Sequence, residues 1–333
     1  MPNFRFAAGC LLAALLGAAP ALASESLPII IKFSHVAAVD TPKGQAAELF
    51  KKLAEERTKG RVKVEVYPNS QLYKDKEELE ALQMGAVQML APGVTKFGPL
   101  GIKEFEAFDL PFLFDDYDAV RPVTQGPIGR GLLKKMESKG LVGLAYWDNG
   151  FKLLTSNKPF NKVENFRGQK LRIHSSKVVD AQMRAWGAMP QVMAFSEVYP
   201  ALQTGVIDGQ ENPAENILTQ KFYEVQKYLT VSNHAYMAYA VVTNKKFWDG
   251  LPPDIRAILE GAMDETTAYE TAITKSRNDT ALAKIRAMST ITVVDLTPEE
   301  RDALRKAVEP VYRDAEGRVG KEIVEAIRKT AQH

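Results

Sequence analysis

Residues 169–213, QKLRIHSSKVVDAQMRAWGAMPQVMAFSEVYPALQTGVIDGQENP, contain the pattern that decides the fold. The run opens at 170–173 with a short apolar strand that carries one arginine among its hydrophobic residues. Ser196 is placed to cap a later helix, and Gly205 is placed to end it. The polar residues 208–213 suit a sharp corner between a strand and a helix. This alternation of strands and helices predicts an α/β fold.

Arg172 is an unusual residue for such a strand, and the sequence leaves two interpretations open. An arginine at a strand end often reaches solvent or pairs with a neighbouring carboxylate. Its planar guanidinium is also the side chain best suited to bind a ligand carboxylate through two parallel hydrogen bonds. In α/β proteins, ligands bind beyond the carboxyl ends of strands, where helix N-termini offer free N–H groups. Arg172 is therefore a candidate ligand-binding residue.

The chain before this stretch begins with the same alternation. Residues 29–33 predict a strand, and a helix is expected from Pro42 because apolar residues follow at helical spacing. Residues 62–67 alternate between apolar and polar side chains, which is typical of a strand with one buried face. These patterns predict core packing and no chemistry.

Further strands and helices are expected on either side of the central stretch. Asp75 is placed to cap a helix, with Glu78 three residues later as in a capping box. Residues 87–91 predict a strand, so Lys96 lies just beyond a strand end. Residues 141–147 predict another buried strand. The phenylalanine-rich run from 108 to 114 is expected to pack in the core.

The C-terminal third is predicted to be mainly helical. Residues 234–242 predict a strand, and from 254 to 288 there is no proline and only one glycine, which indicates one long helix. Such a helix exceeds the usual globular length. Thr297 is placed as an N-cap, followed by proline at the first helical position and by a capping-box Glu300.

The composition bounds the class of protein. The chain has 333 residues, of which 45% are hydrophobic and 25% charged, as expected of a globular protein large enough for two lobes. The formal net charge of +2 gives no reason to expect binding to nucleic acid or to a membrane surface.

Residues 1–23 predict a secretory signal peptide cleaved near Ala23, because an arginine, an apolar run and a small-x-small site follow one another. A membrane anchor is the alternative, but the apolar run is shorter than the roughly 20 residues that span a bilayer. Cys10 is the only cysteine, and the apolar run mostly follows it, unlike in a lipoprotein. The mature chain is therefore expected in the periplasm without disulfides or thiolate chemistry.

Motifs for cofactors and catalysis are missing. The sequence has no glycine-rich phosphate loop, no His-Glu-x-x-His and no Gly-x-Ser-x-Gly, and its four histidines lack ligand spacing. No cofactor and no metal are therefore expected. A secreted enzyme acting on an organic acid, with Glu211 or His35 as base, is the alternative to a binding protein. No nucleophile, base and orienting residue occur in a recognisable pattern, so we expect no catalysis.

Seven segments in the same order resemble one family over nearly the whole mature chain. They are FSH at 33–35, PNSQL at 68–72, WDNGFK at 147–152, LRI at 171–173, FSEVY at 195–199, LQTG at 202–205 and DGQENP at 208–213. The sequence resembles the solute-binding proteins of tripartite ATP-independent periplasmic (TRAP) transporters, of the DctP kind.

The resemblance implies a two-lobed periplasmic binding protein fold, with a ligand cleft between the lobes and a long helix spanning both. After the signal peptide at 1–23, lobe I is expected to comprise residues 24–150 plus about 235–285. Lobe II is expected to comprise residues 151–234 plus about 286–330. The loaded receptor would dock on the membrane subunits of a TRAP transporter and would not span the membrane itself.

The resemblance also implies a ligand clamp. Arg172 would bind one carboxylate with two hydrogen bonds, while Lys152 and Lys96 would supply further positive charge. Phe195 would contact the carbon chain of the ligand, and Asn212 would donate and accept hydrogen bonds. For Phe195, plain core packing stays an open alternative. Further candidates for ligand contact are His35, Ser175, Gln71, Asn149 and Tyr236; for Tyr236 core packing also stays open, and for His35 a hydrogen bond within its own loop.

The expected ligand is a small organic acid with two carboxylates. Lysine at 152 and 96 departs from relatives that bind larger sugar acids, in which arginine is usual, and a compact charge suits a small ligand. Residues 147–152 and 175–177 resemble most the C4-dicarboxylate branch, whose ligands are succinate, fumarate and malate. A receptor for a sugar acid or a monocarboxylate is the alternative within the family.

Overall fold

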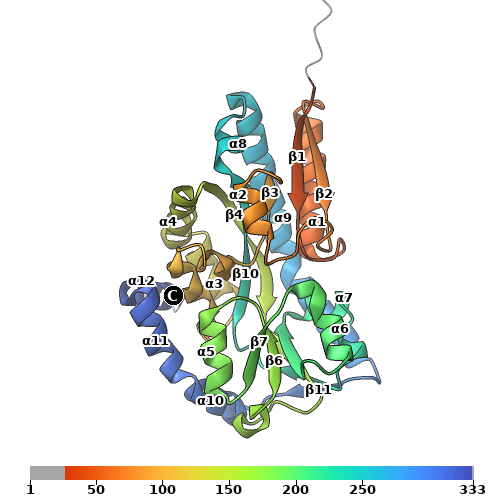
Figure 1. Cartoon of the computed structure of the whole chain (residues 1–333), viewed down its shortest axis with the longest axis vertical. Helices are drawn as coiled ribbons and strands as arrows, with labels where there is room; N and C mark the ends of the chain where they lie inside the picture. The colour runs from red at the N-terminus through yellow and green to blue at the C-terminus, as the bar shows by residue number, and fades with distance from the viewer. Residues whose placement is uncertain (1–26, 332–333) are drawn as a thin grey trace, which may run out of the picture.

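The computed structural model describes residues 27–331, so the predicted signal peptide lies outside the described residues. The described chain is α/β, as predicted, and contains two mixed sheets with helices around them (Figure 1). Within residues 27–331 no helix has the length and apolar character needed to cross a bilayer.

The first sheet, sheet A, has five strands in the order β2-β1-β3-β10-β4. β1 runs parallel to β2 and β3, whereas β10 is antiparallel to both β3 and β4. The predicted strands are present, although the third is only two residues long. The strands are β1 (Ile29–Ser34), β2 (Val62–Tyr67), β3 (Met89–Leu90), β4 (Leu141–Phe151) and β10 (Tyr236–Asn244).

The second sheet, sheet B, has six strands in the order β11-β9-β5-β8-β6-β7. The strand that carries Arg172 is parallel to both of its neighbours, β7 and β8, so their carboxyl ends meet at one edge. The strands are β5 (Leu153–Ser156), β6 (Lys170–Ile173), β7 (Met189–Val192), β8 (Gly209–Asn212), β9 (Tyr228–Val231) and β11 (Thr292–Asp295).

The chain passes between the two sheets at three places. β4 leads into β5 through Lys152, and β9 leads into β10 through residues 232–235. These two crossing segments touch, because the backbone N–H of Lys152 donates to the carbonyl of Ala235 at 2.8 Å. The third connection is α9 (Pro253–Arg286), the predicted long helix of 34 residues, which contacts β4 of sheet A and β11 of sheet B.

Only some of the other helices begin at the capping residues that the sequence predicts. Thr41 caps α1, and Thr297 forms the predicted capping box with Glu300. Asp75 does not cap α2, and Ser196 caps no helix, so both predictions were wrong. The helices are α1 (Pro42–Arg57), α2 (Glu78–Gln83), α3 (Tyr117–Thr124), α4 (Pro127–Lys135), α5 (Lys177–Ala185), α6 (Val198–Gln203), α7 (Ala214–Thr219), α8 (Lys245–Asp249), α10 (Pro298–Ala307), α11 (Glu309–Val319) and α12 (Lys321–Ala331).

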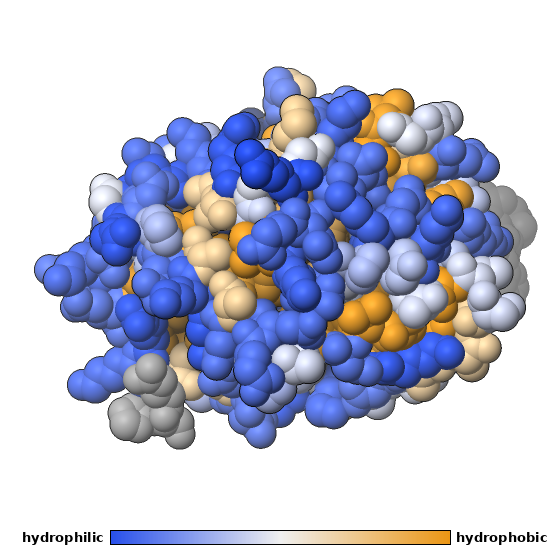
Figure 2. Space-filling model, turned by 90° about the horizontal axis from the view of Figure 1, so that it is seen from below, coloured by the Kyte–Doolittle hydropathy of each residue, from blue (hydrophilic) through white to orange (hydrophobic). Residues whose placement is uncertain are grey.

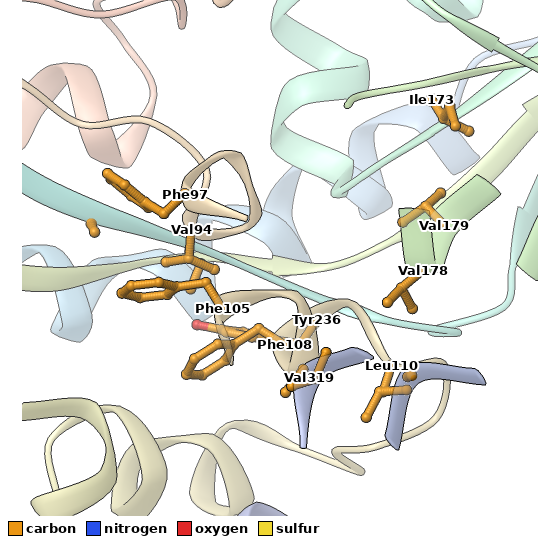
Figure 3. Packing of buried hydrophobic residues seen from close by; sticks show 14 of the residues in the cluster. Val94, Phe97, Phe105, Phe108, Leu110, Ile173, Val178, Val179, Tyr236 and Val319 are labelled. Carbon is orange, nitrogen blue, oxygen red and sulfur yellow. The ribbon is translucent and has the colours of Figure 1, made fainter. Parts of the chain in front are cut away.

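Three apolar clusters hold these elements together. One lies between sheet A, α1 and α9, and another between sheet B, α6, α7 and the end of α9. The largest joins both sheets: Figure 3 shows Phe105, Phe108 and Tyr236 with Val178 of α5 and Val319 of α11. The phenylalanine-rich run is therefore core, as predicted.

The C-terminal helices contact elements beside both sheets. α12 contacts α3, whereas α11 contacts α5 and the 3₁₀ helix η2 (Lys103–Asp109). The division of the chain into two lobes at the predicted residues stays a prediction. Seen from the end that carries sheet B, the surface is mainly hydrophilic with separate hydrophobic groups (Figure 2).

Candidate functional site

A small cavity of about 30 Å³ lies between elements of the two sheets. Four of the predicted ligand-binding residues line it, namely Arg172, Lys96, Phe195 and Asn212. The remaining lining residues are Val36, Ala37, Lys43, Asp75, Glu78, Gly93, His174, Asn216, Met237 and Tyr239. The charged lining residues Arg172, Asp75, Lys96, Glu78 and Lys43 are called the cavity cluster below.

Arg172 reaches the cavity from β6 and is 4% exposed. Its Nε and Nη2 donate to the carbonyl of Met193 at 3.0 and 2.8 Å, which fixes one edge of the guanidinium. Nη2 also lies 3.7 Å from Oδ2 of Asp75. Arg172 therefore lies near a carboxylate and also lines a cavity, and its binding of a ligand stays a prediction.

Asp75 is held by groups that follow strands of both sheets, because Lys96 lies in the 3₁₀ helix η1 (Val94–Phe97) after β3 and Phe195 follows β7. Its Oδ2 lies 2.9 Å from Nζ of Lys96, and its Oδ1 accepts the backbone N–H of Phe195 at 3.0 Å. Burial opposes ionisation of Asp75, but Lys96 and Arg172 outweigh it and hold the pKa of the carboxyl below its usual range. Three groups predicted to hold a ligand thus surround a carboxylate of the protein itself.

Phe195 and Asn212 are fixed by neighbouring side chains in and beside sheet B. Phe195 begins the 3₁₀ helix η5 (Phe195–Glu197). Its ring packs edge-on against that of Phe222, with 6.2 Å between the ring centroids. The side-chain amide of Asn212 donates to Gln210, while its oxygen accepts from Asn216 at 3.0 Å. Both side chains are therefore oriented without a contribution from a ligand.

Lys43 was not predicted from the sequence, although it lines the cavity and is only 2% exposed. It lies in the first turn of α1, where the helix dipole disfavours a cation. The sequence could have indicated a role for Lys43 through this position. A lysine in the first turn is unfavourable, and α1 has no acidic residue there to compensate its charge.

Lys152 lies at the crossing between β4 and β5 and outside the cavity lining. Its Nζ lies 2.8 Å from Oε1 of Glu211 and 3.5 Å from Oδ1 of Asp109. Burial opposes ionisation, but these two carboxylates outweigh it and raise the pKa of Lys152. A ligand carboxylate would have to compete with both acids, and contact of Lys152 with a ligand stays a prediction.

Two histidines complete this second group of charges, called the crossing cluster below: Lys152, Glu211, Asp109, His174 and His234. Nε2 of His234 lies 2.7 Å from Oε2 of Glu211, and Nε2 of His174 lies 3.3 Å from Oδ2 of Asp109. Burial would raise the pKa of Glu211, yet Lys152 and His234 hold it well below its usual range. An ionised, fully paired Glu211 is a poor general base.

The other predicted site residues lie outside the cavity lining. His35 is fully buried, and neither ring nitrogen has a hydrogen-bond partner among residues 27–331; burial together with Lys43 lowers its pKa to about 3. Tyr236 donates to Asp148 in the core, and Asn149 donates to the sulfur of Met237 at 3.3 Å.

Ser175 and Gln71 differ from these because they are not buried. Ser175 lines a neighbouring pocket of about 400 Å³ that shares Asp75 and Lys96 with the cavity, whereas Gln71 is exposed at the surface. The described residues contain no group of three or more His, Cys, Asp or Glu side chains arranged to hold a metal ion. The cations Arg172, Lys96 and Lys43 that line the cavity are groups that can bind an anion.

Comparisons with known proteins point in the same direction. Residues 33–318 match a family model described as DctP, bacterial extracellular solute-binding protein, family 7. A C4-dicarboxylate-binding periplasmic protein DctP from Rhodobacter capsulatus is 58% identical over 309 residues, which are 93% of this chain and 92% of that protein.

Solved structures match over most of their length. A TRAP periplasmic solute binding protein from Shewanella oneidensis with bound succinate has a TM-score of 0.89 at 44% identity, covering 91% of this chain and 99% of that one. A second, from Pseudomonas aeruginosa with bound L-malate, has a TM-score of 0.84 at 41% identity, covering 86% and 100%. The two-lobed fold expected from the sequence is thereby confirmed.

Proposed function

Because this chain belongs to the bacterial extracellular solute-binding proteins of family 7, the DctP family, we propose that it is the extracytoplasmic receptor for a C4-dicarboxylate. Succinate, fumarate and malate are the proposed ligands. The loaded receptor delivers its ligand to the membrane subunits of a TRAP transporter.

The placement of the Asp75 carboxylate carries this proposal. It is surrounded by Lys96, which follows β3 of sheet A, by Arg172 of β6 in sheet B, and by the N–H of Phe195, which follows β7. A set of donors that holds one carboxylate is already arranged for another, since charge-assisted hydrogen bonds require the same geometry. A ligand carboxylate would therefore use these partners in place of Asp75.

Closure around the ligand follows from the size of the cavity. At about 30 Å³ it has room for about one or two water molecules and is too small for a C4 acid. The ligand thus enters when the sheets move apart or when Asp75 turns toward the neighbouring pocket, which Asp75 and Lys96 also line. A ligand that bridges the cations of both sheets stabilises the closed form through its higher affinity for it.

The relatives favour a dicarboxylate over the alternatives. The Rhodobacter protein is named for C4-dicarboxylates, and the two solved relatives hold succinate and L-malate. A receptor for a sugar acid or a monocarboxylate is the second candidate within the family. We propose no catalysis, because Glu211 is paired with Lys152 and His234.

The proposed receptor begins near Ser24 after cleavage at about Ala23 and resides in the periplasm. Mass spectrometry of the exported protein measures this directly. An intact N-terminus, or a lipid on Cys10, would contradict it.

Calorimetry and thermal unfolding test the ligand. With succinate at a hundredfold excess over its dissociation constant, the free energy of unfolding should rise by about 2.7 kcal/mol. Fumarate and malate should act similarly, whereas galactonate and butyrate should have little effect. A shift with galactonate alone would overturn the dicarboxylate proposal, and new products in the NMR spectrum of malate would overturn the proposal of a receptor without catalysis.

A further inference from the structure

Lys43 is the member of the cavity cluster whose positive charge is least compensated. Arg172 and Lys96 each have a carboxylate within 4.0 Å, whereas Lys43 has none among the described residues. Its Nζ donates to the carbonyl of Ala91 at 3.2 Å and lies 3.6 Å from the centre of the Tyr239 ring. An ammonium has three donors, so the described contacts leave Lys43 with unused hydrogen-bonding capacity inside the protein.

The surroundings of Lys43 make its positive charge unfavourable for the stability of the fold. The charged and titratable groups facing it are Glu78 of α2, Asp75, Lys96, Glu270 of α9, His35 at the end of β1 and Tyr239 of β10. Burial lowers the pKa of Lys43 to about 7, and Lys96 acts in the same direction against the opposing effect of Glu78. A buried ammonium without a nearby anion destabilises the fold unless something else requires it.

The positions of Lys43 and Arg172 suggest why a buried lysine is present, because both residues line the cavity. Lys43 approaches the cavity from α1, which packs on sheet A, whereas Arg172 approaches from β6 of sheet B. A linear ligand with an acid group at each end would meet one cation from each sheet.

We infer that Lys43 binds the second carboxylate of the ligand, opposite Arg172, and so selects dicarboxylates over monocarboxylates. This inference rests on the proposed function and gives Lys43 the role that the sequence had suggested for Lys152. It also makes binding depend on pH, since only the protonated lysine attracts the carboxylate. Above pH 7, binding of succinate takes up a proton, and the affinity falls toward tenfold for each pH unit.

The test compares Lys43→Met with the wild-type chain by calorimetry, using succinate and butyrate as a matched pair of di- and monocarboxylate. The loss of a charge-assisted hydrogen bond should weaken succinate binding about ten- to hundredfold, with little change for butyrate. The affinity of Lys43→Met for succinate should also be nearly constant above pH 7. Lys52→Met, an exposed position on the same helix, is the control and should match the wild type.

The outcomes separate this inference from the proposed function. If wild-type protein does not bind succinate, the proposed function fails and the inference fails with it. If the wild type binds and Lys43→Met binds equally well, only the role of Lys43 is overturned. The melting temperature without ligand should not fall in Lys43→Met or in Lys43→Gln; unfolding of both variants would show a structural lysine and would also overturn the inference.

Discussion

The cavity cluster and the crossing cluster are built from the same kinds of residue and differ in how their charges are paired. In the crossing cluster, Lys152 has two carboxylate partners, and Glu211 is held by Lys152 and His234. In the cavity cluster, Asp75 is shared between two cations and Lys43 has no carboxylate within 4.0 Å among the described residues. Complete pairing indicates a structural role, and incomplete pairing next to a cavity indicates a binding role.

The largest expected effect tests the crossing cluster. Glu211→Gln leaves Lys152 buried with a single weaker partner, so the free energy of unfolding should fall by about 3 to 5 kcal/mol. Urea unfolding of the ligand-free protein measures this. Lys152→Met combined with Glu211→Gln should recover part of the loss, because the uncompensated charge is removed. Stability of Glu211→Gln close to that of the wild type would remove the distinction between the clusters.

The cavity cluster should respond in binding more than in stability. Arg172→Lys keeps the charge but loses the planar fork, so succinate binding should weaken by about 1.5 to 3 kcal/mol, or roughly ten- to hundredfold. Loss of the hydrogen bonds to Met193 should cost the ligand-free fold only about 0.5 to 1.5 kcal/mol. Calorimetry and unfolding of one purified variant give both quantities; a large loss of stability with unchanged affinity would reverse the assignment.

At acidic pH, the crossing cluster should lose more of its contribution to stability than the cavity cluster. Asp75 and Glu211 both have pKa values below their ordinary 3.8 and 4.5, so their ionised forms stabilise the fold above those values. That stability is lost as the pH falls from the ordinary pKa through the lower pKa of the folded state. As the pH falls below about 4.5, Glu211→Gln should therefore flatten the pH dependence of stability more than Asp75→Asn. The opposite order in urea unfolding would count against the comparison.

The smallest effect is expected outside both clusters. Lys74 and Glu197 form an exposed ion pair at 2.8 Å between the segment before α2 and η5, beside the Asp75 contact. Exposed pairs contribute little and are screened by salt. Lys74→Ala should leave the melting temperature unchanged and weaken succinate binding slightly at low salt only. A weakening that persists at high salt would mean that this pair, too, belongs to the binding site.

Most of the fold could be predicted because its signals are local. The apolar stripe after Pro42 and the alternation of residues 62–67 are properties of single elements, and both elements formed as expected. Thr297 and its capping box are equally local. Asp75 has a similar local pattern, but its carboxylate is bound by Lys96 and by Phe195, which lies 120 residues away. A tertiary contact therefore replaced the cap.

The site could be predicted only in part for the same reason. Arg172 stands out as an arginine in an apolar strand, whereas Asn212 was implied by the family resemblance, and both line the cavity. The sequence cannot distinguish the roles of Lys152 and Lys43, because both are lysines. They differ in the folded structure, where Glu211 and Asp109 form ion pairs with Lys152. Pairing of this kind is decided by the packing of distant segments, which no short motif records.

The strand order of sheet A also sets the time at which the chain can fold. β10 lies between β3 and β4, so this sheet cannot close until residues 236–244 are present, long after β1 to β4 have been synthesised. Contacts between such distant segments form slowly. Because this inner strand comes late in the chain, sheet A can form only after most of the sequence has been synthesised.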